Sequence, residues 1–352
     1  MFRYKRRPHL KFPCLLVFLF HTHIHTTNNT MTAQTYATLN RTGDKMPLVG
    51  FGCWKVSPED AEATIYNAIK SGYRLIDGAA DYGNEVEVGR GINKAIKEGI
   101  VTREEVFVVT KLWNTYHNKD RLRGAFDKQL KDLGLDYVDL YLIHFPVPLK
   151  HVDIDQAYPA GWYQPNKTEI EFEPSPMHEC WREMEKLVEA KLARNIGVSN
   201  FNVQLILDLL TYAKIKPAVL QVELHPYLQQ SRMVTWVQSQ GIQITAYSSF
   251  GPASFVDLTT DGKTAAPLLE HATIKEIANK HNKTTGQVLL RWSTERNVAV
   301  IPKSTNQERI KSNLDIFSWS LDKEDMDKIA SLEKGLRFND PYSYNFNLPL
   351  FD

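Results

Sequence analysis

An acid, a phenol and a lysine stand close to the ends of apolar runs in the first third of the chain. Asp77 closes the apolar run in GYRLIDGAADYGNE, Tyr82 follows five residues later, and Lys111 ends the run VFVVTK. A phenol has an ordinary pKa of about 10 and donates a proton poorly at neutral pH unless a cation stabilises its phenolate. Lys111 is the candidate for that cation, and Asp77 is the candidate for the acid that positions it.

His144 closes the next apolar run, LYLIHFP, and completes a set that fits general-acid chemistry on a carbonyl compound. An imidazole at this place can hydrogen-bond a substrate oxygen and orient the carbonyl. The sequence contains no G-x-S-x-G nucleophile motif and no metal-ligand cluster, so we expect no metal. Protonation of a carbonyl oxygen also requires a hydride for the carbon, which indicates a nicotinamide cofactor.

Each residue taken alone has a simpler structural explanation. An isolated aspartate after a strand usually caps a loop or helix, and an isolated lysine there extends its ammonium to solvent. A histidine such as His144 is more often a hydrogen-bonded core residue, and Asp81, next to Tyr82, is expected to be a solvated loop acid. The catalytic interpretation is favoured because these polar residues close successive apolar runs, where barrel enzymes place their sites.

The elements that position these residues alternate between short apolar runs and amphipathic helical segments from Lys45 onward. The expected strands end near Gly52, Asp77, Lys111, His144, Asn200, Glu223, Ser248 and Lys303. Eight strands alternating with helices over roughly 270 residues predict an α/β fold, a (β/α)8 TIM barrel with an N-terminal hairpin and a long C-terminal loop. A doubly wound sheet is the weaker alternative, because no G-x-G-x-x-G follows any expected strand.

Local signals mark the helix starts. Ser57-Pro58-Glu59-Asp60 predicts an N-cap with a first-turn proline, and Gly72 predicts the end of that helix. Ser175-Pro176 predicts the start of another. The long segment before it, from Pro146 to about Ser175, contains YPAGWYQPNKTEIEFEPSP. Its aromatic residues favour a lid or a pocket wall.

Composition limits the partners. The chain has 352 residues and a net charge of +1, which gives no basic surface for nucleic acid or a membrane. A small-molecule substrate is therefore expected. The three cysteines, Cys14, Cys53 and Cys180, are odd in number and far apart, which fits a reduced, cytoplasmic protein. Monomer and homodimer both remain open.

The first thirty residues differ from the rest. A basic start precedes a short apolar core from Phe12 to Phe20, which is too short to span a bilayer and lacks a small-residue cleavage site. The following polar tract, with His21, His23 and His25, favours a disordered tail over a metal site. Met31 opens a segment typical of a natural start. We expect residues 1–30 to be a disordered or weak targeting extension, and residues 31–352 to form a single barrel domain.

Seven segments resemble the successive signatures of the aldo-keto reductases, in order, from about Leu39 to Asp352. They are GYRLIDGAADYGNE, VVTKLWN, LYLIHFP, NIGVSNF, LQVELHPYLQQ, TAYSSFGP and VIPKS. Within that family GFGCWKV, YPAGWY, KLARNIGVSNF and LRFNDPYSY are similar to segments of the fungal D-xylose reductases. The resemblance implies a catalytic tetrad of Asp77, Tyr82, Lys111 and His144, with Tyr82 as the proton donor.

The resemblance also implies a set of cofactor contacts. Ser199, Asn200 and Gln221 would hold the carboxamide, and Tyr247 would stack on the nicotinamide ring. Charge-assisted bonds from Lys303, Ser304 and Arg309 to a 2′-phosphate favour NADPH, with NADH possible but weaker. The remaining expected cofactor contacts are Ser248, Phe250, Asp257, Thr305 and Asn313.

Several residues depart from the family pattern. Thr305 stands where many xylose reductases have Asn, Ser312 where Glu often contacts adenine, and Asp257 where Glu touches ribose. These changes put the use of NADH in doubt more than that of NADPH. Leu224 replaces a frequent His. For the substrate, the resemblance implies a pocket lined by Trp54, Trp113, His144, Phe145 and Asn339.

The favoured function is NADPH-dependent reduction of D-xylose to xylitol. A same-class alternative is a broader reductase of L-arabinose, other aldoses or small aldehydes. A nicotinamide-binding regulatory barrel would bind cofactor without turnover, and a phosphate-binding barrel of unrelated chemistry would not bind nicotinamide at all.

Overall fold

Eight parallel strands form one curled sheet in the computed structural model, which describes residues 35–344 and 346–351. The expected extension, residues 1–30, lies outside the described residues. The strands follow chain order and are β3 Phe51–Gly52, β4 Leu75–Asp77, β5 Phe107–Leu112, β6 Val138–Ile143, β7 Ala193–Ser199, β8 Val219–Glu223, β9 Gln243–Tyr247 and β10 Val298–Val300. Gly50 N donates to Val300 O and Val300 N donates to Leu48 O, each over 2.8 Å, which closes the sheet on itself. The predicted (β/α)8 TIM barrel is confirmed.

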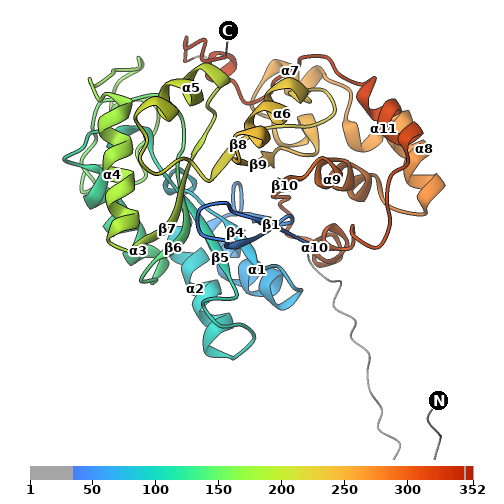
Figure 1. Ribbon diagram of the computed structural model, residues 1–352, viewed down its shortest axis with the longest axis horizontal. Helices are drawn as coiled ribbons and strands as arrows, with labels where there is room; N and C mark the ends of the chain where they lie inside the picture. The colour runs from blue at the N-terminus through green and yellow to red at the C-terminus, as the bar shows by residue number, and fades with distance from the viewer. Residues whose placement is uncertain (1–34, 345, 352) are drawn as a thin grey trace, which may run out of the picture. The chain divides into compact units, whose positions relative to one another are not determined.

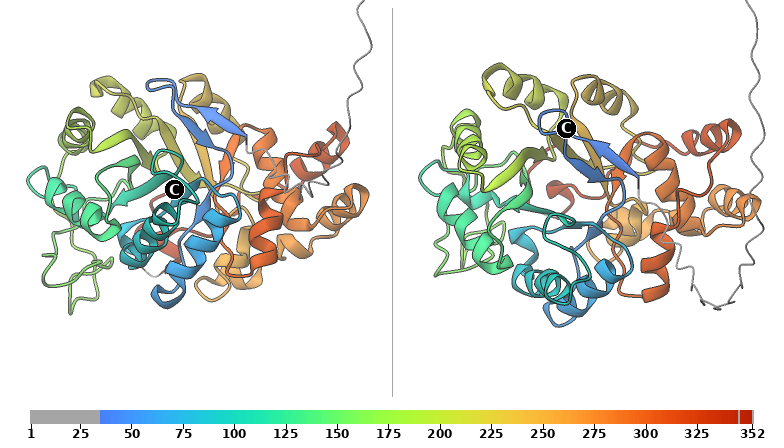
Figure 2. Two further views of the ribbon diagram at one scale, coloured as in Figure 1. Left: turned by 90° about the horizontal axis from the view of Figure 1, so that it is seen from below. Right: turned by 60° about the horizontal axis from the view of Figure 1, so that its bottom comes forward.

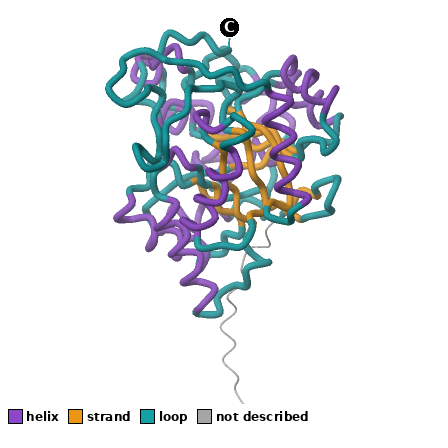
Figure 3. Tube along the Cα trace, turned by 90° about the vertical axis from the view of Figure 1, so that its left-hand side faces the viewer, coloured by secondary structure: helices purple, strands orange, loops and turns teal. Residues whose placement is uncertain are grey.

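Helices surround this sheet, and longer loops gather at the end of the barrel where the C-terminal segment lies (Figures 1 and 3). The α-helices are α1 Pro58–Lys70, α2 Glu85–Lys97, α3 Leu122–Leu133, α4 Met177–Glu189, α5 Val203–Tyr212, α6 Ser231–Ser239, α7 Thr260–Thr264, α8 Ala272–His281, α9 Thr285–Glu295, α10 Gln307–Leu314 and α11 Lys323–Ala330. Short 3-10 turns are η1 Ala80–Tyr82, η2 Asn114–Tyr116, η3 Gly251–Ser254, η4 Leu268–Glu270 and η5 Pro341–Tyr344. Within the described residues, no helix is long and apolar enough to cross a bilayer.

The predicted N-terminal hairpin is formed by β1 Tyr36–Thr38 and β2 Lys45–Pro47, which pair antiparallel. Figure 2 shows these two strands in blue beside the barrel strands. The buried residues Leu39 and Met46 pack against Phe107 and Leu140 of the barrel. Burial of this apolar surface fastens the hairpin to the barrel.

Most predicted boundaries agree with the structure to within one residue. The exception among the strands is β10, which ends at Val300 rather than near Lys303. Pro302 has no N–H to donate to a ladder, so regular pairing stops before it. At α1, Ser57 Oγ accepts from Asp60 N as predicted. At α4, Pro176 occupies the N-cap position and Ser175 makes no capping bond.

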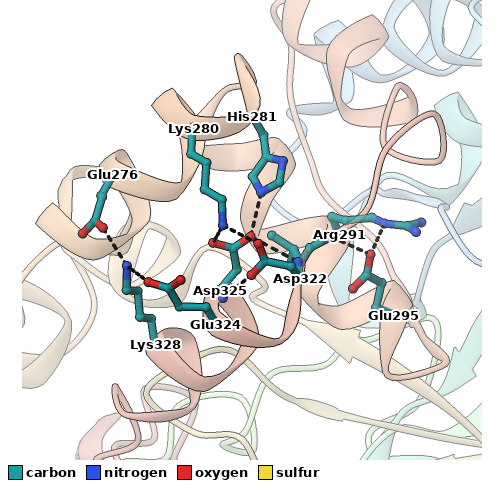
Figure 4. A network of polar contacts seen from close by, with 10 residues as sticks. Glu276, Lys280, His281, Arg291, Glu295, Asp322, Glu324, Asp325 and Lys328 are labelled. Carbon is teal, nitrogen blue, oxygen red and sulfur yellow. Dashed lines mark hydrogen bonds and ion pairs between the residues drawn. The ribbon is translucent and has the colours of Figure 1, made fainter.

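The last helix, α11, is fixed to α8 by a network of ion pairs (Figure 4). Asp325, which is fully buried, accepts hydrogen bonds from Lys280 Nζ at 2.8 Å and lies 2.6 Å from His281 Nε2. Lys280 also contacts Asp322, the N-cap residue of α11, at 2.5 Å. The network therefore fixes the chain just ahead of its C-terminal segment, of which residues 331–344 and 346–351 are described.

Candidate active site

The carboxyl ends of the strands surround one cavity of about 740 Å³. It brings together most of the residues predicted from sequence, although they come from positions spread over the whole barrel. Those that line it are Trp54, Asp77, Tyr82, His144, Phe145, Ser199, Asn200, Gln221, Tyr247, Ser248, Phe250, Asp257, Lys303, Ser304, Thr305, Arg309, Asn313 and Asn339. Lys111 and Trp113 are buried behind this wall.

Lys111 is the centre of the predicted tetrad. Its ammonium is fully buried and donates three hydrogen bonds, to Asp77 Oδ1 at 2.6 Å, Gly78 O at 2.9 Å and Tyr82 Oη at 3.1 Å. These bonds use all three of its donors. The second carboxylate oxygen of Asp77 accepts from Gln221 Nε2 at 2.7 Å. Lys111 is therefore fixed between an acid and a phenol, as the sequence predicted.

Tyr82 has a phenol pKa raised well above its ordinary value, chiefly by burial and further by the carboxylates of Asp77 and Asp81. At neutral pH the phenol therefore carries its proton. The ammonium of Lys111 stabilises the phenolate that forms when the proton leaves. Tyr82 is thus protonated at neutral pH, and the Lys111 ammonium lies beside the phenol oxygen from which the proton would leave.

His144 is neutral at physiological pH. Burial lowers its pKa well below the usual value, and the positive charge of Lys111 lowers it further. Its ring lies edge-on to Tyr82 with centroids 5.8 Å apart, and Asn200 Nδ2 donates to its backbone carbonyl at 2.9 Å. A neutral imidazole can hydrogen-bond a carbonyl oxygen without adding a charge to the cavity.

Side chains with hydroxyl and amide groups form the adjoining wall. Ser199 Oγ donates to Gln221 O at 2.9 Å, and Tyr247 Oη donates to Asn200 Oδ1 at 2.6 Å. Asn200 has a left-handed backbone, with φ of 63°, which turns the chain at the end of β7. These contacts fix the wall where the sequence predicted carboxamide recognition.

The far end of the cavity carries positive charge. Lys303 and Arg309 are exposed, and neither makes an ion pair within the described part of the chain. Ser304 and Asn313 are buried beside them. Two uncompensated cations with neighbouring hydroxyl and amide groups fit a phosphate-bearing cofactor. The donor set suits the predicted NADPH.

The substrate side combines aromatic rings with amide and carboxyl groups. Asn339 Nδ2 donates to Tyr247 Oη at 2.9 Å, and Tyr344 Oη donates to Asn339 Oδ1 at 3.0 Å. Trp113, predicted to line the pocket, is instead placed behind His144, with ring centroids 5.4 Å apart. Trp162 from the long loop packs against Trp113 at 5.4 Å, which accounts for that placement.

Asp81 differs from its prediction as a solvated loop acid. It is half-buried, lines the cavity beside Tyr82, and burial raises its pKa to about 7. The signal for this position in the sequence was that Asp81 directly precedes Tyr82. The structure places both residues in the single turn η1. Sequence reasoning also missed Lys55, whose Nζ donates to Ser254 O at 2.7 Å and so joins the β3 end to η3.

Residues 46–334 match the model of the Aldo/keto reductase family. The chain therefore belongs to the aldo/keto reductase family and is an oxidoreductase.

The names of individual relatives differ in substrate, and that of the Candida tropicalis reductase also states the cofactor. The chain is 66% identical over 317 residues to the 4-dihydromethyl-trisporate dehydrogenase of Mucor mucedo, covering 90% of this chain and 99% of that protein. It is 56% identical over 310 residues to the NAD(P)H-dependent D-xylose reductase I,II of Candida tropicalis, covering 88% and 95%. The structure of the aldose reductase from Schistosoma japonicum matches with a TM-score of 0.75 at 36% identity, covering 84% and 92%. The predicted dependence on NAD(P)H is confirmed.

Proposed function

We propose that the protein reduces the open-chain aldehyde of D-xylose to xylitol with NADPH. The observation that carries the proposal is the bonded series Asp77–Lys111–Tyr82 at a cavity whose wall also holds Asp81 and Asn339. Carboxyl and amide groups suit the hydroxyls of an aldose, and the aromatic wall suits its C–H surfaces.

The geometry supports one proposed role for each residue of the tetrad. When bound, the nicotinamide supplies a hydride to the carbonyl carbon. His144 hydrogen-bonds the carbonyl oxygen and orients it, and Tyr82 gives that oxygen its proton. Lys111 stabilises the resulting phenolate, and Asp77 keeps the lysine in place.

Cofactor recognition divides between the two ends of the cavity. Ser199, Asn200 and Gln221 would hold the carboxamide, with Tyr247 against the ring. Lys303, Ser304 and Arg309 would hold the 2′-phosphate, and this positive end supports a preference for NADPH over NADH. The other proposed cofactor contacts are Ser248, Phe250, Asp257, Thr305 and Asn313. The protein is proposed to act in the cytoplasm, with residues 31–352 as its single domain.

A second candidate is the oxidation of 4-dihydromethyl trisporate, the substrate in the name of the Mucor mucedo relative. The identity of 66% to that protein favours it, as does an aromatic group at the substrate side. Trp162 packs against Phe145 and Phe346, each at 5.1 Å between centroids. The same residues serve both directions, because a proton leaves an alcohol by the path through which it arrives.

The test uses protein beginning at Met31 and follows nicotinamide absorbance in both directions. D-Xylose, L-arabinose and glyceraldehyde are offered with NADPH and with NADH, and xylitol and 4-dihydromethyl trisporate are offered with NADP+. Saturable NADPH oxidation with D-xylose supports the first proposal. Turnover of 4-dihydromethyl trisporate alone replaces it with the second. Cofactor binding without turnover of any compound supports the regulatory barrel instead.

A further inference from the structure

Glu223, at the end of β8, holds the C-terminal segment through its side chain. It is fully buried, and its Oε1 accepts a hydrogen bond from Phe338 N while its Oε2 accepts one from Asn339 N, both over 2.8 Å. His225 Nε2 lies 2.8 Å from Oε1. Hydrogen bonds to an ionised acceptor are about twice as strong as neutral ones, so this carboxylate is a firm anchor.

The loop after β8 continues the same attachment. Tyr227 O accepts from Lys334 N at 3.1 Å and from Leu336 N at 3.0 Å. Gln229 Nε2 donates to Ala330 O at 2.9 Å. The chain from α11 to Asn339 thus lies along residues 223–229 and is held to them by successive hydrogen bonds. It begins at α11, which is itself fixed to α8 (Figure 4).

Asn339 is the point where this attachment reaches the cavity. Its Nδ2 donates to Tyr247 Oη, which donates to Asn200 Oδ1, and Asn200 Nδ2 donates to the His144 carbonyl. A continuous polar series therefore joins Glu223 to His144. Glu223 is not among the residues that line the cavity, and Asn339 is the cavity residue to which it is directly hydrogen-bonded.

We propose that Glu223 is a positioning residue that sets the register of the C-terminal segment and places Asn339 against the substrate. Without the carboxylate, only a fraction of the molecules hold Asn339 in the competent position. Apparent affinity falls by that fraction, so a competent population of about one tenth raises KM about tenfold. Saturating substrate restores the competent state, so kcat is retained. The KM effect rests on the proposed aldose substrate.

The test compares Glu223→Gln with a matched control, Glu185→Gln. Glu185 on α4 is also buried, and its Oε1 accepts backbone hydrogen bonds from Lys214 N at 2.7 Å and Ile215 N at 2.8 Å, but it does not line the cavity. In Glu223→Gln we expect KM for D-xylose to rise about tenfold, with kcat within about twofold. KM for propanal, which has no hydroxyl for Asn339 to bind, stays within about twofold. Glu185→Gln leaves all three values near wild type.

A second readout does not depend on the substrate. Hydrogen exchange of the peptide covering residues 336–344 should be faster in Glu223→Gln than in wild type, and unchanged in Glu185→Gln. Equal exchange in all three proteins, or a KM shift no larger than in the control, overturns the proposal. If Glu223→Gln does not fold, Glu223→Asp, which keeps the charge and shortens the reach, takes its place. If the wild-type protein is inactive on D-xylose, only the proposed function is overturned. The KM values of the variants are then measured with an aldehyde that the wild-type protein does reduce.

Discussion

The ammonium of Lys111 lies 3.1 Å from the phenol oxygen of Tyr82, and its two other hydrogen bonds hold it on Asp77 and Gly78. The lysine therefore cannot turn away when the phenol loses its proton. Burial keeps that proton on Tyr82 at neutral pH, while the fixed cation lowers the cost of releasing it. Tyr82 therefore keeps its proton until transfer, and the phenolate that transfer leaves behind is stabilised by Lys111.

Replacing Tyr82 by Phe removes the proton donor and keeps the ring. We expect kcat for aldehyde reduction to fall by about 10²- to 10⁴-fold, the usual contribution of a positioned general acid. NADPH affinity, measured by tryptophan fluorescence, should remain close to wild type. Retained turnover would remove Tyr82 from the role of acid.

Replacing Lys111 by Met should affect both stability and activity. The change leaves the buried carboxylate of Asp77 without its cation, which costs about 3–5 kcal/mol of unfolding free energy, and kcat should fall about a hundredfold or more. Adding Asp77→Asn removes the unpaired charge, so urea denaturation should show partial recovery of stability while activity stays low. Recovery of activity in the double variant would contradict the assigned role of the lysine.

Replacing Lys303 by Met should separate the two cofactors. Loss of a charge-assisted bond of about 1.5–3 kcal/mol should weaken NADPH about tenfold to a hundredfold, while NADH changes little. Lys311→Met is the control, because Lys311 is an exposed lysine on α10 that does not line the cavity. Equal weakening of both cofactors in Lys303→Met would show that the 2′-phosphate binds elsewhere.

The raised pKa of Asp81 should make the free energy of unfolding depend on pH. Burial raises its pKa from 3.8 to about 7 in the folded state, so the folded protein retains a proton that the unfolded chain loses. Stability should therefore decline as pH rises through this range and level off above about pH 7. Asp81→Asn removes this effect, so its Tm should exceed that of wild type by more at pH 8 than at pH 5. The same difference at both values would exclude a raised pKa for Asp81.

The sequence was sufficient to predict the barrel and the grouping of Asp77, Tyr82, Lys111 and His144, because both depend on local order. Asp77 and His144 lie at the ends of apolar runs, and parallel strands in a barrel bring such ends to one rim. The environment of Asp81 depends instead on remote segments. The neighbouring Gly83 shows how close the long loop comes, since an added Cβ there would lie 3.6 Å from Pro159.

Trp113 illustrates a second limit. A tryptophan after a strand can point into the cavity or into the packed core behind it. Which of the two it does depends on the side chains that pack against it. Here Trp162, 49 positions further along the chain, packs edge-on against it. Likewise, the contact of Glu223 with Phe338 and Asn339 joins residues too far apart in sequence for any periodic pattern to reveal.

The hydrogen bonds of Val300 with Gly50 and Leu48 join two parts of the chain separated by about 250 residues. During synthesis, the ribosome releases Tyr82 and Lys111 long before Lys303 exists. Contacts between such distant positions form slowly, because a long loop must close first. A nascent chain therefore contains Tyr82 and Lys111 before it contains the cations Lys303 and Arg309, and the cavity is complete only when the last strand pairs with the first.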